Sequence, residues 1–237
     1  MQNVSTRAPW FAATMTALFL ASPALAADNK DEIERVSRSI EVLQQLMSAP
    51  DDAIPEHILE RAEAIVVIPT LVKGGFVLGA EHGKGVMSIR NRGRGTWSVP
   101  SFVAVTGGTV GWQIGVHAVD LVLLVMNTDG IDDLLSSKFT LGANGSVAAG
   151  PVGRAAHAAT DATMGAKILA YSRARGLFAG ATLEGSSLRH DTDANRRVYG
   201  GEYSAREVFA MTPPAALPRV LDTWRDTLRG LASTTHD

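Results

Sequence analysis

The chain has 237 residues, of which 46% are hydrophobic, and this is enough apolar material for a folded core. Its 22 basic and 24 acidic residues give a formal net charge of −2, so no overall positive field indicates nucleic acid as a partner. The absence of cysteine excludes disulfides, thiolate metal sites and a cysteine nucleophile.

The first 26 residues have the pattern of a secretory signal peptide. Arg7 supplies the positive end, residues 10–20 are apolar, and residues 22–26 (SPALA) end in an Ala-x-Ala cleavage pattern. The apolar stretch is shorter than the roughly 20 residues that a membrane-spanning helix needs, which makes an uncleaved anchor the weaker alternative. The sequence therefore predicts cleavage after Ala26 and export to a bacterial periplasm.

Two helices are predicted before the first strand. Residues 28–47 are predicted to form a helix that Asp28 can cap. One side of this helix carries a regular apolar stripe, which consists of Ile33, Val36, Ile40, Leu43 and Met47. Pro55 begins a second, short helix over residues 55–61. The stripe is expected to pack on the core. Attachment to a bilayer surface is the alternative, but it is weakened by the mixed charges of the polar face.

From residue 64, short β-branched segments alternate with glycine-containing turns. Strands are predicted at 64–68, 76–78, 86–89, 96–99, 101–106, 110–117 and 119–126. Such spacing favours an antiparallel sandwich or barrel-like sheet. The glycines inside the strands predict bulges that curve the sheet.

The second half adds a short helix at 130–137, a strand at 139–147, and a late hairpin that pairs 166–171 with 177–183. After Leu188 the chain is polar and helical. The last helix carries an apolar stripe formed by Leu217, Leu221, Trp224, Leu228 and Leu231. The predicted class is α+β, with a glycine-rich, mainly antiparallel curved sheet and flanking N- and C-terminal helices. No linker divides residues 30–237, so residues 27–237 are expected to form one domain.

Two carboxylates are candidates for chemistry. Asp120 interrupts an apolar run and needs a partner, for which Arg154 and Lys73 are the candidates. Glu184 lies in a similar setting. A hydrolase centred on Asp120 and Glu184 is an alternative, but no nucleophile elbow or oriented histidine accompanies them. We expect Asp120, Arg154 and Glu184 to be structural, with no enzyme activity, metal or cofactor.

Basic side chains are the remaining polar signal. They form one cluster near Trp97 and one late pair: Lys84, Arg90, Arg92, Arg94, Arg173 and Arg175. An indole beside arginines suits an anionic membrane interface, and a solvated hairpin tip is the alternative. Four bases at about 1 kcal/mol each reach only about millimolar affinity. Apolar insertion or a pocket must therefore add the rest.

Several segments share their order and spacing with a known family: AIVVIP at 64–69, KGGFV at 73–77, GKGV at 83–86, WSVPSF at 97–102, QIG at 113–115, LG at 141–142, GPVGR at 150–154 and YSRARGLFAG at 171–180. From about residue 54 to 188 the chain resembles the SYLF domain family. The resemblance implies binding to anionic lipids and no known catalysis, with phosphoinositides and actin as partners of eukaryotic members.

This resemblance sets the expected function. Residues 27–237 are expected to form a SYLF-like domain that binds anionic phospholipid surfaces through Lys84, Arg90, Arg92, Arg94, Trp97, Arg173 and Arg175. No Src-homology or FYVE module is present, and a periplasm offers no actin, so actin and phosphoinositides are not expected as partners. A structural module that binds another envelope protein is the alternative.

Overall fold

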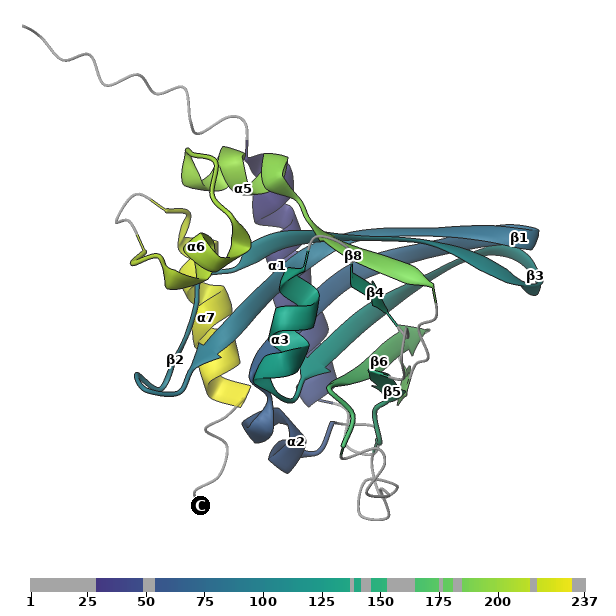
Figure 1. Cartoon of the computed structure of the whole chain (residues 1–237), viewed down its shortest axis with the longest axis horizontal. Coiled ribbons are helices and arrows are strands. Elements are labelled where there is room, and N and C mark those ends of the chain that lie inside the picture. The colour runs from purple at the N-terminus through teal and green to yellow at the C-terminus, as the bar shows by residue number, and fades with distance from the viewer. Residues whose placement is uncertain are drawn as a thin grey trace, which may run out of the picture.

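Eight strands form one nearly closed, mostly antiparallel curved sheet that is flanked by helices (Figure 1). The computed structural model describes residues 29–48, 54–136, 139–141, 146–152, 165–174, 177–180, 185–213 and 217–231. The elements are α1 (Lys30–Met47), α2 (Glu56–Arg61), β1 (Ala64–Asn91), β2 (Thr96–Trp97), β3 (Ser101–Val125), α3 (Thr128–Leu135), β4 (Phe139–Leu141), β5 (Val147–Ala149), β6 (Ile168–Ala174), β7 (Leu177–Gly180), β8 (Ser186–His190), α5 (Thr192–Tyr199), α6 (Ala205–Ala210) and α7 (Arg219–Leu231). The predicted α+β class and curved sheet are confirmed.

Strands β1 and β3 form one long antiparallel ladder. β1 has 28 residues and β3 has 25, and they pair from Ala64 with Val125 to Met87 with Ser101. The short strands predicted between residues 64 and 126 are therefore mostly parts of two long strands. The prediction was wrong because glycines read as turns lie inside the ladder, where they allow bulges and bends without ending it.

The two halves of β1 come into backbone contact. A Cβ atom added to Gly85 would lie 2.0 Å from the carbonyl oxygen of Val67, and one added to Gly83 would lie 2.7 Å from Ile68 Cγ2. Only glycine permits so close an approach. Between these halves, residues 72–82 of β1 and 106–118 of β3 project from the body (Figure 1), and we call these two segments the arm.

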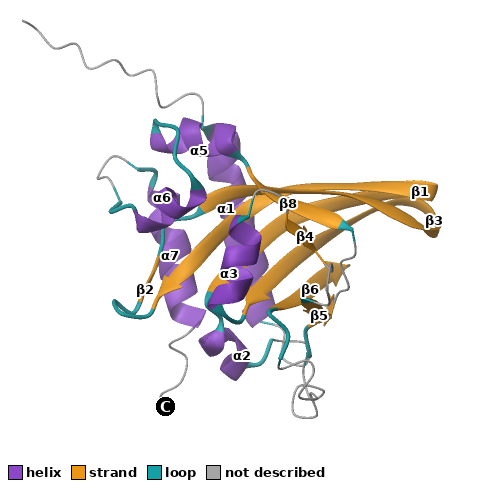
Figure 2. Ribbon diagram, viewed as in Figure 1, coloured by secondary structure: helices purple, strands orange, loops and turns teal. Residues whose placement is uncertain are grey.

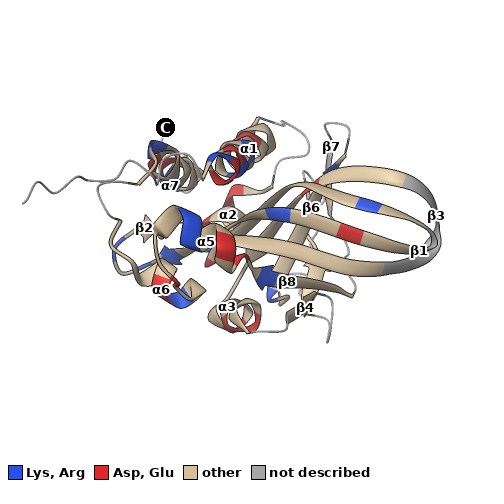
Figure 3. Ribbon diagram, turned by 90° about the horizontal axis from the view of Figure 1, so that it is seen from above, with Lys and Arg blue, Asp and Glu red and all other residues tan. Residues whose placement is uncertain are grey.

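The sheet is covered on one side by α1 and α7, and α3 lies on the opposite side (Figure 2, Figure 3). Alternate residues of β3 serve the two layers: Val122 and Leu124 pack in the cluster of α1, α2 and α7, while Leu121 and Leu123 pack in the cluster of α3, β4 and α6. This alternation explains why β3 is apolar on both faces.

The predicted helical stripes are largely confirmed. In α1 the buried apolar side chains include Val36, Ile40 and Leu43, whereas Met47 is 37% exposed. In α7 the buried positions are Leu221, Trp224, Leu228 and Leu231. The expected cap Asp28 lies outside the described residues, and the N-cap is Asn29, which makes no side-chain capping hydrogen bond.

The late part of the sheet differs from the prediction in two places. The hairpin of β6 and β7 is confirmed, with Tyr171 opposite Gly180. In place of one strand over 139–147, the described residues form two short strands, β4 and β5. Strand β8 was missed, because Ser186, Ser187 and Arg189 make its sequence polar although Leu188 is buried.

Candidate functional site

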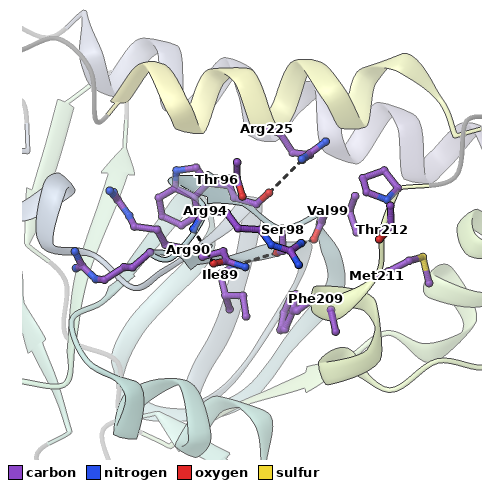
Figure 4. A pocket seen from close by; sticks show the side chains of 15 residues that line it. Ile89, Arg90, Arg94, Thr96, Ser98, Val99, Phe209, Met211, Thr212 and Arg225 are labelled. Carbon is purple, nitrogen blue, oxygen red and sulfur yellow. Dashed lines mark hydrogen bonds between the residues drawn. The ribbon is translucent and has the colours of Figure 1, made fainter.

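A cavity of about 480 Å³ lies between the hairpin of β1 and β2, the segment after α6, and helix α7 (Figure 4). Its lining includes four arginines and no aspartate or glutamate. The arginines are Arg90, Arg92, Arg94 and Arg225, and apolar parts of the wall come from residues such as Phe209. We call this cavity the arginine cleft.

The hairpin turn places two of these arginines at the rim. The backbone N–H of Arg94 donates to the Asn91 side-chain oxygen at 3.2 Å, and Gly95 has a φ of +62°. An Asn side chain that bonds to the backbone, followed by a left-handed glycine, is typical of tight turns. The turn leaves Arg92 and Arg94 exposed.

Arg90 is held deeper in the wall. It lies opposite Trp97 in the strand pair, and its guanidinium carbon lies 4.6 Å from the centroid of the indole ring. Its Nη2 donates to the Leu59 carbonyl oxygen at 3.0 Å. Burial, with a further effect from Arg92, lowers the pKa of Arg90 below its ordinary value. Arg90 thus combines a structural contact with a position in the cleft wall.

Arg92 and Arg94 differ in their partners. Arg92 pairs with the Glu63 carboxylate at 2.6 Å and donates to the Arg61 carbonyl oxygen at 3.1 Å, so it caps the C-terminal end of α2. The exposed Arg94 side chain makes no hydrogen bond or ion pair with other described residues. Arg94 is therefore the cation of the cleft that is most available to a ligand.

The third wall is fixed by α7. Arg225 Nε donates to the Trp97 carbonyl oxygen at 3.1 Å, and Figure 4 shows its side chain reaching from the helix toward the hairpin. Trp224 Nε1 donates to the Ser88 hydroxyl at 2.8 Å, and that hydroxyl donates to the Ser98 carbonyl oxygen at 3.2 Å. These bonds hold α7 against the hairpin and give the cleft a defined shape.

The cleft brings together Arg90, Arg92, Arg94 and Trp97 from the predicted set, but the indole is only 4% exposed. Trp97 therefore offers no apolar surface to a membrane in this conformation. Its ring packs in the hydrophobic core, and Arg90 stacks on the face of the ring.

Lys84 lies outside the arginine cleft. Its ammonium group is 3.9 Å from Asp191, which also pairs with Arg35 at 3.1 Å. Lys84 and Arg35 border a second cavity of about 330 Å³, near Thr70. That cavity is lined by both acidic and basic residues, so it has no clear preference for an anion.

The structure pairs Asp120 with Arg173 and not with Lys73, which was one of the two predicted candidates. Its carboxylate pairs with Arg173 Nε at 3.0 Å and accepts the Thr70 backbone N–H at 3.1 Å. Strand register explains this pairing, because Asp120 and Arg173 are direct partners across β3 and β6. Lys73 instead pairs with Glu81, and Arg154, Arg175 and Glu184 lie outside the described residues.

Sequence reasoning missed two polar positions. No motif or spacing in the sequence indicates that Arg225 contacts the hairpin, because only the packing of α7 brings this residue to the cleft. Glu81 is 3% exposed and is bound by Lys73 and the Ser186 hydroxyl. In the described part of the chain no group of three His, Asp or Glu could hold a metal ion, and no helix is long and apolar enough to span a bilayer.

Comparison with known proteins gives consistent matches. Residues 106–230 match the family model Ysc84, described as "Las17-binding protein actin regulator". The chain is 36% identical over 211 residues to Protein YSC84 of Saccharomyces cerevisiae, covering 86% of this chain and 43% of that protein. LAS seventeen-binding protein 3 of S. cerevisiae is 38% identical over 181 residues, covering 73% and 39%.

A human relative extends the comparison. SH3 domain-containing YSC84-like protein 1 of Homo sapiens is 30% identical over 205 residues, covering 83% of this chain and 59% of that protein. The chain thus spans about half the length of these relatives. We expected anionic lipids as partners and no link to actin, and these matches contradict that expectation. The names of the family and the relatives refer to Las17, actin regulation and SH3 domains and to no lipid.

Proposed function

The chain belongs to the Ysc84 family, and on this premise we propose that it is a non-enzymatic domain whose arginine cleft binds an acidic segment of a protein partner. The description of the family is that of a binding protein and regulator, not of an enzyme. Because the chain spans only part of each relative, a role in Las17 binding or actin regulation is itself part of the proposal.

The observation that carries this proposal is the charge of the cleft. Four arginines line it and no carboxylate does. Glu63 pairs with Arg92, and Asp222 lies 3.4 Å from Arg225, so two of the four charges are partly compensated. Arg90 and Arg94 have no such ion pair among the described residues. Guanidinium groups in a concave site favour carboxylates, which they can bind with two parallel hydrogen bonds.

The shape of the site favours a protein segment over a membrane surface. The arginines line a cavity, and a flat bilayer can reach only those at its rim. Trp97, the one indole in the lining, is buried and cannot insert into lipid. Binding to anionic phospholipid, as expected from sequence alone, uses the same charge chemistry and is therefore a separate outcome of the experiment below.

The test measures binding of a fluorescent peptide that alternates Asp and Glu, by anisotropy. Arg94→Glu is expected to weaken binding by about tenfold or more and to reduce its salt dependence. The matched control is Arg189→Glu, since Arg189 is an exposed arginine on β8 outside the cleft. Equal loss in both variants would mean that binding follows net charge and not the cleft.

Two further arms identify the partner class. Cosedimentation with filamentous actin tests the partner named by the family description. Flotation with vesicles of phosphatidylglycerol or phosphatidylcholine tests lipid. Binding to actin or the acidic peptide that depends on Arg94 supports the proposal. Binding to phosphatidylglycerol vesicles alone, with no affinity for either protein probe, would overturn it.

Export is proposed from residues 1–26, which lie outside the described residues. The expected result is a mature chain that begins at residue 27 and is recovered in a periplasmic fraction. Mass spectrometry of the isolated chain checks this. A full-length chain that is retained in the cytoplasm would contradict it.

A further inference from the structure

The arginine cleft has walls of two different kinds. All four of its arginines come from the hairpin and from α7, whereas the wall formed by residues 209–213 (FAMTP) contributes no charged side chain. Figure 4 shows Met211 and Thr212 across the cavity from Arg90. A ligand that enters the cleft therefore meets guanidinium groups on one side and uncharged, mostly apolar side chains on the other.

Helix α6 holds the uncharged wall in place. Ser204 and Glu207 form a capping box at the start of this helix. Arg206 pairs with Asp132 at 2.7 Å and so links α6 to α3. Phe209 is buried in the core cluster of α3, β4 and α6. These contacts are all internal to the protein, so the wall is formed before any ligand binds.

Met211 gives this wall an accessible apolar contact. Its backbone N–H donates to the Val208 carbonyl oxygen at 3.2 Å, which ends α6, and its φ of −64° and ψ of 133° lead the chain away in an extended conformation. The Met211 side chain lines the cavity and is half-buried, whereas Phe209 is only 8% exposed. A flexible, unbranched thioether adapts to apolar groups of different shape. Met211 is therefore suited to contact an apolar part of a ligand.

The two walls favour a ligand with two kinds of side chain. A carboxylate that faces residues 209–213 loses water and meets no cation there, which is unfavourable. In an extended peptide, successive side chains point to opposite sides. A segment with acidic residues at every second position can therefore direct its carboxylates toward the arginines and the side chains between them toward Met211. A volume of about 480 Å³ suits a short segment of this kind.

We propose that the arginine cleft selects a short extended segment in which acidic residues alternate with apolar ones, and that Met211 determines this specificity by contacting the apolar side chains. The inference rests on the proposed function and adds a requirement that charge alone does not make. Exposed ion pairs contribute little each and are screened by salt, so arginines alone distinguish poorly between one acidic segment and another. The apolar contact supplies that distinction.

Fluorescence anisotropy with two peptides of equal length and charge tests the specificity. One peptide alternates Asp with Leu, and the other alternates Asp with Ser. The Asp-Leu peptide is expected to bind about fivefold tighter or more, because its leucines lose part of their contact with water against the apolar wall. This advantage should persist when salt is added, since salt screens charges and does not weaken apolar contacts. A peptide that alternates Asn with Leu should bind more weakly than the Asp-Leu peptide.

Substitutions at Met211 locate the apolar contact. Met211→Gln keeps the length of the side chain and makes its end polar, so it should remove the advantage of the Asp-Leu peptide and leave binding of the Asp-Ser peptide unchanged. Met211→Leu stays apolar and should keep the advantage. The matched control is Met47→Gln, since Met47 is 37% exposed on α1 outside the cleft. Circular dichroism shows whether each variant is folded, and Met211→Ala makes the same comparison if Met211→Gln is unfolded.

The results separate this inference from the proposed function. Equal affinity of the wild type for the Asp-Leu and Asp-Ser peptides, with both lost in Arg94→Glu, would overturn the specificity and leave the proposed function standing. An advantage of the Asp-Leu peptide that Met211→Gln retains would also overturn the inference, because the apolar contact would then lie elsewhere. Absence of any peptide binding that depends on Arg94 would overturn both.

Discussion

Arg90 lies over the ring of Trp97, with 4.6 Å between the guanidinium carbon and the ring centroid, and the two residues face each other directly across β1 and β2. This contact divides the basic cluster of the hairpin into two kinds of arginine. Arg90 is part of the wall, with its side chain bound to the Leu59 carbonyl, whereas Arg94 lies exposed at the rim.

The first prediction follows from that division. Arg90→Ala is expected to lower the free energy of unfolding by about 1–3 kcal/mol, because it removes the contact with Trp97 and the hydrogen bond to Leu59. Arg94→Ala should change it by less than about 0.5 kcal/mol, as expected for an exposed residue. Urea denaturation measures both. A larger loss for Arg94→Ala than for Arg90→Ala would contradict the assignment.

The second prediction concerns Gly150. A Cβ atom at this position would lie 2.0 Å from Cζ of Tyr171, whose ring is fully buried. Gly150→Ala is therefore expected to destabilise the protein by about 1–3 kcal/mol through overpacking. Gly230→Ala is the matched control, since the added Cβ on α7 would meet no atom within 4 Å apart from its chain neighbours and the helix's own backbone. There alanine is expected to stabilise by up to about 1 kcal/mol, because glycine is a poor helix former. Thermal and urea unfolding of both variants provide the comparison.

The third prediction concerns Thr70, which has a φ of +63°. This left-handed conformation is costly for a β-branched residue and is imposed where the ladder shifts register between Ile68 and Leu71. Thr70→Gly is expected to raise the free energy of unfolding by about 1 kcal/mol. Thr106→Gly, in a regular part of β3, should lower it by about 0.5–1 kcal/mol. A loss in both variants would show that Thr70 carries no strain.

The fourth prediction is a pH dependence caused by His190. Both of its ring nitrogens are buried without a hydrogen-bond partner among the described residues, and burial lowers the pKa of this imidazole below its ordinary value of 6.5. The unfolded chain then binds a proton more readily than the folded one as pH falls. Neutral His190 thus contributes its full stability above pH 6.5. This contribution is lost as the pH falls from 6.5 through the lowered pKa of the folded protein.

Urea midpoints measured at a series of pH values check this effect. His190→Gln is expected to flatten the fall in stability below pH 6.5, whereas His57→Gln, at an exposed position on α2, should leave it unchanged. An unchanged slope in His190→Gln would refute the role of the imidazole.

The carboxylate of Asp191 affects stability in a lower pH range. Burial alone would raise its pKa, but hydrogen bonds from the Ala194 backbone and Arg35 lower it overall, so the stability that this carboxylate contributes is lost only as pH falls below 3.8.

Local patterns in the sequence were enough to predict the two long helices and the fold class. The stripes of α1 and α7 recur at helical spacing, so the buried face of each helix could be read without knowing what covers it. The hairpin of β6 and β7 was also predictable, because two apolar segments flank a short glycine-containing turn. Arg90, Arg92, Arg94 and Trp97 were grouped for the same reason, since one hairpin carries all four.

The tertiary structure decided what sequence spacing could not. The sequence does not show whether a glycine ends a strand or allows two backbone segments to come close together. Gly83 and Gly85 were therefore predicted to lie in turns, although they allow the two halves of β1 to touch. Partners distant in sequence likewise depend on register and packing: Asp120 meets Arg173 because β3 pairs with β6, and Arg225 reaches the cleft because Trp224 anchors α7 to Ser88. The sequence of the hairpin determined that three arginines lie close together. Only the packing of α7 beside the hairpin placed these arginines in the wall of a cleft and buried Trp97.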